Sequence, residues 1–100
     1  KNNIVYVMEK SNNIFSSSRD VIIKNVQNNN EIRYEIDSTV KALQVYDTNI
    51  VLNLGTEAEF INTSGWLQKK YKSKQEIYNI VLGSSIAGIV YRDRVEIINL

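Results

Sequence analysis

Acid and base chemistry in this chain depends on carboxylates and tyrosines, because its 100 residues include no histidine and no cysteine. These absences exclude a zinc site with the usual ligands, a thiol nucleophile, a disulfide and a Ser-His-Asp triad. Two carboxylate pairs are spaced for general acid and base work, Glu57 with Glu59 and Asp93 with Glu96. Residues two apart on a strand share a face at about 7 Å, a separation found around hydrolysed glycosidic bonds. We favour the alternative that these residues keep turns soluble, and we assign no catalytic residue.

A basic strip interleaved with aromatic residues is the second chemical feature. It comprises Lys69, Lys70, Lys72 and Lys74 around Tyr71, with Trp66 nearby. Such a strip could bind single-stranded nucleic acid through stacking and phosphate contacts. The net charge is only +1, however, with 12 basic against 11 acidic side chains. We therefore favour a solvated outer strand, on which lysine discourages edge pairing, and we expect no nucleic-acid partner.

Aromatic side chains beside strand ends are the remaining candidates for ligand contacts. The sequence predicts Tyr46, Trp66, Tyr71 and Tyr91 as binding residues, and Tyr78 occupies a similar position. Tyrosine in such places commonly packs between sheets with its hydroxyl in water, which is the alternative for these residues. No calcium-loop motif and no glycine-rich phosphate loop is present, so we expect no metal and no cofactor.

The elements that must position these residues are strands. Isoleucine (14 residues) and valine (10 residues) fit a pleated, half-buried surface. Segments with period 2, bounded by Asn, Ser, Asp or Gly, predict an all-β fold of about ten short antiparallel strands. The predicted strands are Ile4 to Glu9, Asp20 to Val26, Glu31 to Ile36, Val40 to Tyr46, Ile50 to Leu54, Ala58 to Asn62, Trp66 to Tyr71, Ile77 to Leu82, Ile86 to Tyr91 and Val95 to Asn99.

One segment favours a helix locally. Ser73 to Glu76 has the form of a capping box, and Ile77, Ile80 and Val81 follow at helical spacing before Gly83. The run after Glu76 is nevertheless rich in strand-forming residues. We predict a strand here, with an initial helical turn as the alternative.

An internal repeat organises the strands. Ile50 to Leu52 and Glu59 to Asn62 resemble Ile86 to Gly88 and Glu96 to Asn99 at an offset of about 36 to 37 residues, whereas Val21 to Ile23 precedes Glu59 by about 38. Repeats near 40 residues with four strands each are typical of β-propeller blades. The chain is then one propeller fragment of two to three blades: a partial blade at about 1–37, a full blade at about 38–74 and a partial blade at about 75–100.

A hairpin tip inside the full blade is visible in the sequence. Thr63 to Gly65 connects the strands at Ala58 and Tyr71, and Gln27 to Asn30 makes the corresponding turn one repeat earlier. A tight hairpin requires a residue of positive φ, for which Gly65 is suited.

The second half of the chain resembles a known family. The residues that carry the likeness are Val51 to Gly55, Glu59 to Leu67 and Ile86 to Asp93, within about residues 42–100. They resemble the C-terminal end of a domain-of-unknown-function family from gram-positive anaerobic bacteria, which carries a PQQ- or WD40-like propeller behind one N-terminal membrane helix. The resemblance implies a bacterial source, a propeller-derived fold and an extracytoplasmic, membrane-anchored position. It implies no catalytic or binding residue.

Function follows from these features only as an expectation. We expect a non-catalytic binding or scaffold module that presents loops to a protein or cell-envelope partner. The alternatives are a carboxylate-dependent hydrolase of propeller type and a self-contained small β-barrel. The chain starts at Lys1 without the pattern of a signal peptide, and its longest apolar run, Ile86 to Tyr91, is too short to span a membrane. Open sheet edges at Ile4 to Met8 and Val95 to Leu100 predict self-association.

Overall fold

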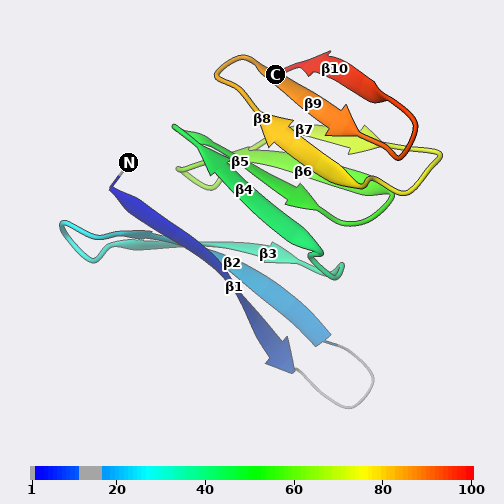
Figure 1. Ribbon diagram of the computed structural model, residues 1–100. Helices are drawn as coiled ribbons and strands as arrows, with labels where there is room; N and C mark the ends of the chain where they lie inside the picture. Colours follow the sequence, from blue (N-terminus) through cyan, green and yellow to red (C-terminus); the bar gives the residue numbers. More distant parts are fainter. Residues whose placement is uncertain (1, 12–16) are drawn as a thin grey trace.

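Ten strands make up the fold, and the described part of the chain contains no helix. The structure is a computed structural model that describes residues 2–11 and 17–100 (Figure 1). The strands are β1 (Asn3–Ser11), β2 (Ser17–Asn25), β3 (Glu31–Ile36), β4 (Ala42–Tyr46), β5 (Asn49–Asn53), β6 (Glu57–Asn62), β7 (Leu67–Lys72), β8 (Asn79–Leu82), β9 (Ile86–Val90) and β10 (Val95–Asn99). The all-β prediction is confirmed, and each predicted strand has its counterpart.

The strands form three antiparallel sheets, and within each sheet the strands pair in the order in which they follow along the chain. The first sheet is β1-β2-β3, the central sheet is β4-β5-β6-β7 and the third sheet is β8-β9-β10. Figure 1 shows them stacked as three blade-like layers, with the central sheet in the middle. No strand pairing joins one of these sheets to another, so the described strands do not close into the small β-barrel that the sequence left open.

Two apolar layers hold the stack together, and each lies between adjacent sheets. Side chains of the first and central sheets form one layer: Val21, Ile23, Ile36, Ile50, Leu52 and Ile61. Side chains of the central and third sheets form the other: Val51, Ala58, Phe60, Ile77, Ile80, Leu82, Ala87, Ile89 and Tyr91. Full burial of a large aliphatic side chain contributes about 1.5 to 3 kcal/mol. Because one of these layers lies on each side of it, the central sheet is apolar on both faces.

The repeat has a single offset of 37 residues in the strand register. Val21 pairs with Tyr34, and Ala58 pairs with Tyr71, 37 positions later in each strand. The offset of about 38 suggested by the sequence is one residue too long for the first blade. A shift of one residue would turn every side chain to the opposite face of the sheet, so burial of the apolar set selects 37.

The segment before β8 bends at Lys74 and Gln75 and contains no helical turn. The Ser73 hydroxyl donates to the Gln75 carbonyl at 2.7 Å and accepts from the Gln75 amide at 3.0 Å, which closes a local turn. Glu76, the far member of the predicted capping box, accepts a hydrogen bond from Lys41 at 2.6 Å instead. The strand prediction is confirmed here, although β8 begins at Asn79 rather than Ile77.

The hairpin tip between β6 and β7 has the predicted conformation. Gly65 has a φ of 83°, in the region that side-chain-bearing residues avoid. The Asn62 side-chain oxygen accepts hydrogen bonds from the amides of Ser64 at 2.9 Å and Trp66 at 3.1 Å. A Cβ at Gly65 would lie 2.6 Å from Ile32 Cγ2 of the first sheet. Glycine is therefore required twice, for its backbone conformation and for the close approach of the tip to β3.

Candidate functional site

A hydrogen-bonded cluster of polar side chains joins the central sheet to the third sheet. The Tyr71 hydroxyl on β7 donates to the Glu96 carboxylate on β10 at 2.6 Å and lies 2.8 Å from the Tyr91 hydroxyl. The Ser73 hydroxyl lies within hydrogen-bond distance of the Tyr91 hydroxyl, at 3.0 Å. Tyr91 is buried, and its ring belongs to the apolar layer beneath the cluster. Two of the predicted binding residues, Tyr71 and Tyr91, thus lie together and bond to each other.

Arg94 completes the electrostatics of this cluster. Its guanidinium lies over the Tyr91 ring at 4.3 Å and bonds to Glu96 at 3.2 Å and to Gln75 at 3.0 Å. The hydrogen bonds from Tyr71 and then from Arg94 lower the pKa of Glu96. The pKa of Tyr71 is raised by its bond to Glu96, then by its bond to Tyr91 and by burial. The cluster therefore holds a neutral phenol against a charged carboxylate, and this bond connects the central sheet to the third sheet.

The same contact joins the first sheet to the central sheet. The Tyr34 hydroxyl on β3 donates to the buried Glu59 carboxylate on β6 at 2.6 Å. Burial and the bond to Glu59 raise the pKa of Tyr34. Each residue of this pair is 37 positions before its counterpart, Tyr34 before Tyr71 and Glu59 before Glu96. Sequence reasoning missed both pairs, although a strict 37-residue alignment would have matched tyrosine with tyrosine and glutamate with glutamate.

The carboxylates proposed for acid–base work are engaged with other partners. Glu59 accepts from Tyr34 between two sheets, and Glu57 lies 3.9 Å from the Lys72 ammonium. Asp93 is 3.3 Å from Arg94, the same guanidinium that bonds to Glu96. The described residues also contain no group of acidic side chains able to hold a metal ion.

The other two predicted binding residues lie at the opposite end of the strands. Tyr46 ends β4, and Trp66 precedes β7 with 69% of its surface exposed. The turns that carry them meet where the Thr63 amide donates to the Thr48 carbonyl at 3.1 Å. The structure therefore divides the four aromatic residues between an inter-sheet cluster and an exposed turn end.

A surface missed by the predicted set lies at the end that carries the β7–β8 and β9–β10 connections. Gln75, Glu76, Tyr78, Arg92 and Asp93 line an open pocket of about 550 Å³ there. A second hollow of about 370 Å³ adjoins it, and Tyr78 and Arg92 line both. We call this set of five residues the Tyr78–Arg92 surface. The signal in the sequence is an aromatic residue beside a strand end. Tyr78 has this signal but is not among the four predicted binding residues.

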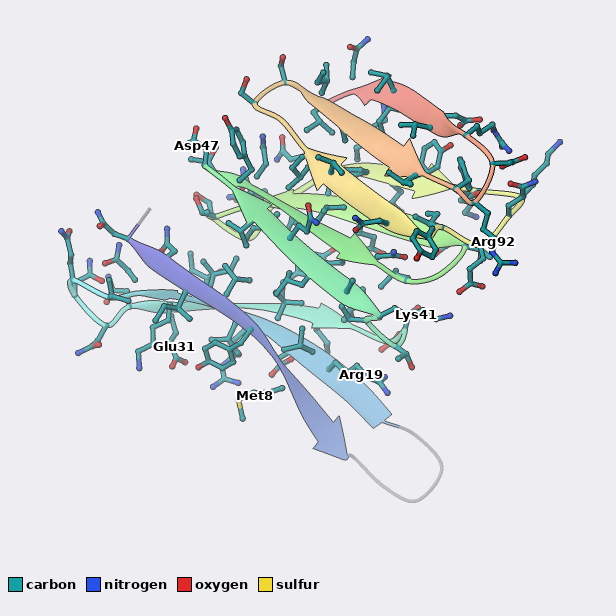
Figure 2. The ribbon with its side chains drawn as sticks, in the orientation of Figure 1. Met8, Arg19, Glu31, Lys41, Asp47 and Arg92 are labelled. Atoms are coloured by element: carbon teal, nitrogen blue, oxygen red, sulfur yellow. The ribbon has the colours of Figure 1, made fainter. Side chains whose placement is uncertain are left out.

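Tyr78 and Arg92 are the side chains of this surface that a ligand could contact most readily. Tyr78 is 73% exposed, while its amide donates to the Val90 carbonyl at 2.8 Å and so fixes its backbone. Arg92 is exposed and forms no ion pair with any residue that the structure describes. Figure 2 shows Arg92 at the same end of the molecule as Lys41 and far from Asp47. An exposed phenol beside an unpaired guanidinium is an arrangement that can bind a ligand.

The predicted basic strip lies on the outer strand of the central sheet. Lys69, Lys70 and Lys72 are exposed along β7, and Lys74 follows in the connection to β8. Lys72 is the member that approaches a carboxylate, that of Glu57. Tyr71 is held by Glu96, so its ring is not presented beside these lysines for stacking on a base.

Comparison of the whole chain with models of protein families, with curated protein sequences and with solved structures finds no match. Across residues 2–11 and 17–100, no helix with the length and apolar character of a membrane span occurs.

Proposed function

We propose that this chain is a non-catalytic binding module, in which stacked propeller-like blades form a rigid scaffold and the Tyr78–Arg92 surface contacts a protein partner. The observation that carries the proposal is the exposed Tyr78 beside the unpaired Arg92 at the rim of two adjoining hollows. Both lie in connections anchored by the apolar layer and by hydrogen bonds between strands. Loops held in this way on a rigid scaffold are common recognition sites.

The chemistry of the surface favours a polypeptide as the ligand. Tyrosine and arginine dominate the binding energy of protein interfaces, because each combines a large apolar area with hydrogen-bond donors. The surface also carries Glu76, which is paired with Lys41, and Asp93, which is paired with Arg94. Its charge is therefore mixed rather than uniformly basic, as a phosphate-binding groove would be. A segment with both acidic and basic side chains matches this combination of charges.

The position of the protein in the cell is a further part of the proposal. The resemblance of residues 42–100 to the propeller family supports a bacterial, extracytoplasmic module attached to a membrane in the full-length protein. Cleavage of the module by protease added to intact cells is the expected result. Protection until the cells are broken would contradict this position.

Titration of the isotope-labelled chain with a model peptide tests the binding surface. The probe is an extended peptide that alternates Lys and Glu around a central Tyr, compared with all-Lys and all-Glu versions. We expect amide shifts confined to residues 75–78 and 92–94, and a dissociation constant raised about tenfold in Tyr78→Ala and in Arg92→Ala. Trp66→Ala, an equally exposed aromatic at the other end, is the matched control and should bind like the unaltered chain.

Three results would contradict the proposal. The first is the absence of shifts with the mixed peptide, and the second is shifts centred on Tyr46 and Trp66. The third is cleavage of a probe that is lost in Glu57→Gln or Glu59→Gln, which would support a carboxylate-dependent hydrolase instead.

A further inference from the structure

The third sheet presents an apolar face to solvent on the side away from the central sheet. Val81, Gly88, Val90, Val95 and Ile97 belong to the residues that line a shallow groove of about 380 Å³ across it. Val95 is 56% exposed and Ile97 is 65% exposed. We call this the third-sheet outer face. A contiguous apolar area of this kind on a sheet commonly marks an interaction site.

The 37-residue repeat shows what covers these positions elsewhere in the chain. Val95 and Ile97 correspond to Ala58 and Phe60 of the central sheet, because Val90–Val95 and Gly88–Ile97 repeat the pairing of Asn53–Ala58 and Val51–Phe60. Ala58 and Phe60 are buried against the third sheet. One repeat earlier, Val21 and Ile23 occupy the same positions and are buried against the central sheet. In both cases the cover is the following sheet of the stack.

The outer face of the first sheet is the counterpart of the face by which the central sheet contacts the sheet before it. Ile4 pairs with Lys24 and Tyr6 pairs with Ile22, so Ile4 and Tyr6 correspond to Ile50 and Leu52. In the central sheet those positions are buried against the preceding sheet. Ile4 and Met8 are instead about half exposed, and Figure 2 shows Met8 directed away from the other two sheets.

Both faces lack the residues that form the tyrosine–glutamate bond at the other contacts between sheets. At both contacts between adjacent sheets, or seams, a tyrosine of the outer strand, β3 or β7, donates to a glutamate of the next sheet. The first sheet has Ile22 at the position of that glutamate, since Ile22, Glu59 and Glu96 are 37 residues apart. The third sheet, as described, ends with β10, the counterpart of β6, and has no counterpart of β3 or β7 to carry a tyrosine. A contact between the third and first sheets therefore contains no tyrosine–glutamate bond. The polar groups on this face of the first sheet include Tyr6, Lys24 and the Asp20–Arg33 ion pair of 3.1 Å.

We propose that the third-sheet outer face binds the outer face of the first sheet of a second copy, head to tail, in the same geometry that stacks the sheets within one copy. Two such seams close a ring of six sheets, within the range of four to eight blades found in propellers. The contact uses sheet faces. It shares Val90 with the second hollow beside the Tyr78–Arg92 surface and otherwise involves different residues.

Sedimentation velocity of the purified chain over a wide concentration range tests the pairing. We expect a dimer that becomes monomeric in Ile97→Lys, in Val95→Lys and in Ile4→Lys, because each places a charge in one seam. Val45→Lys is the matched control, since Val45 is a similarly exposed residue of the central sheet outside both faces, and it should remain dimeric. Circular dichroism checks that each variant keeps its strands.

Mixing distinguishes a head-to-tail seam from other arrangements. Ile97→Lys and Ile4→Lys chains, each monomeric alone, should together form a one-to-one complex, because the mixture retains one intact seam. A monomer at every concentration would overturn the proposal and point to a following repeat of a longer chain as the cover. A dimer that survives Ile97→Lys and Val95→Lys would also overturn it, as would dimerisation of Ile4→Lys alone, which would indicate pairing of two third-sheet faces.

Discussion

Tyr71 and Glu96 are joined by a hydrogen bond of 2.6 Å that crosses from the central sheet to the third sheet. The bond between Tyr34 and Glu59 repeats it at the same length across the other seam. Each seam thus combines an apolar layer with one phenol–carboxylate bond at its outer strand. This combination specifies the register of one sheet on the next, because the polar pair meets only when both strands are aligned.

Removal of the Tyr34 hydroxyl should destabilise the fold. In Tyr34→Phe the buried Glu59 carboxylate loses the donor that balances its burial, a loss of about 1 to 3 kcal/mol in the free energy of unfolding. Tyr71→Phe should cost less, because Glu96 is more exposed and keeps its bond to Arg94. Urea unfolding gives both values, with exposed Tyr46→Phe as the control. Equal stability of Tyr34→Phe and Tyr46→Phe would contradict a role for the bond.

Alkaline pH should destabilise the protein through the same two tyrosines. The pKa values of Tyr34 and Tyr71 are raised in the folded state, so above the unfolded value of about 10 the unfolded chain loses protons that the folded chain retains. Their contribution is full below that pH and is lost as pH rises through the raised values. The free energy of unfolding measured from pH 8 upward should fall more steeply than in the Tyr34→Phe, Tyr71→Phe double variant. Parallel curves would contradict this assignment.

Acid should act through Glu96. Its pKa is lowered in the folded state by Tyr71 and Arg94, so the stabilisation is present above the unfolded value of about 4.3 and is lost as pH falls through the folded value. We expect Glu96→Gln to be less stable than the unaltered chain at pH 7 and to lose less stability on acidification. Thermal unfolding followed from pH 7 to pH 3 measures both. An identical pH dependence in the two proteins would show that Glu96 does not contribute.

A methyl group at Gly65 should disturb the hairpin tip. Gly65→Ala places a side chain at a φ of 83° and brings its Cβ to 2.6 Å from Ile32. The backbone conformation alone costs about 1 to 2 kcal/mol, and the contact adds to it. Ser64→Ala at the same tip is the matched control, because the bond from Ser64 to Asn62 is made by the Ser64 amide and the change should stay within about 0.5 kcal/mol. Similar unfolding midpoints for the two variants would contradict the requirement for glycine at the tip.

The candidate binding residues show where sequence reasoning stopped. The sequence predicts Tyr71 and Tyr91 as binding residues because they are aromatic residues beside strand ends, but in the structure they bond to each other and to neighbours between sheets. Tyr78, which has the same sequence environment, is the exposed one. Exposure depends on which residues of another sheet lie opposite, and those residues are 20 or more positions away in the chain. A local pattern carries no information about them.

In the serine-rich segment at residues 16–19, too, the local sequence pattern and the structure differ. The sequence favours a loop at Ser16 to Ser18 with Arg19, a candidate for recognition. Ser16 lies outside the described residues, whereas Ser17, Ser18 and Arg19 begin β2 and pair with β1. Hydrogen bonds to the neighbouring strand override the weak strand propensity of serine.

The sequence alone determined the all-β class, the ten strands, their order in a repeated unit and the glycine at the hairpin tip, because these depend on period-2 burial and on turn residues close together in the chain. The tertiary structure decided the one-residue register of the repeat, the two tyrosine–glutamate bonds between sheets and the exposure of Tyr78 and Ile97. Each of these depends on which face of a strand meets another sheet, and a shift of one residue reverses that choice.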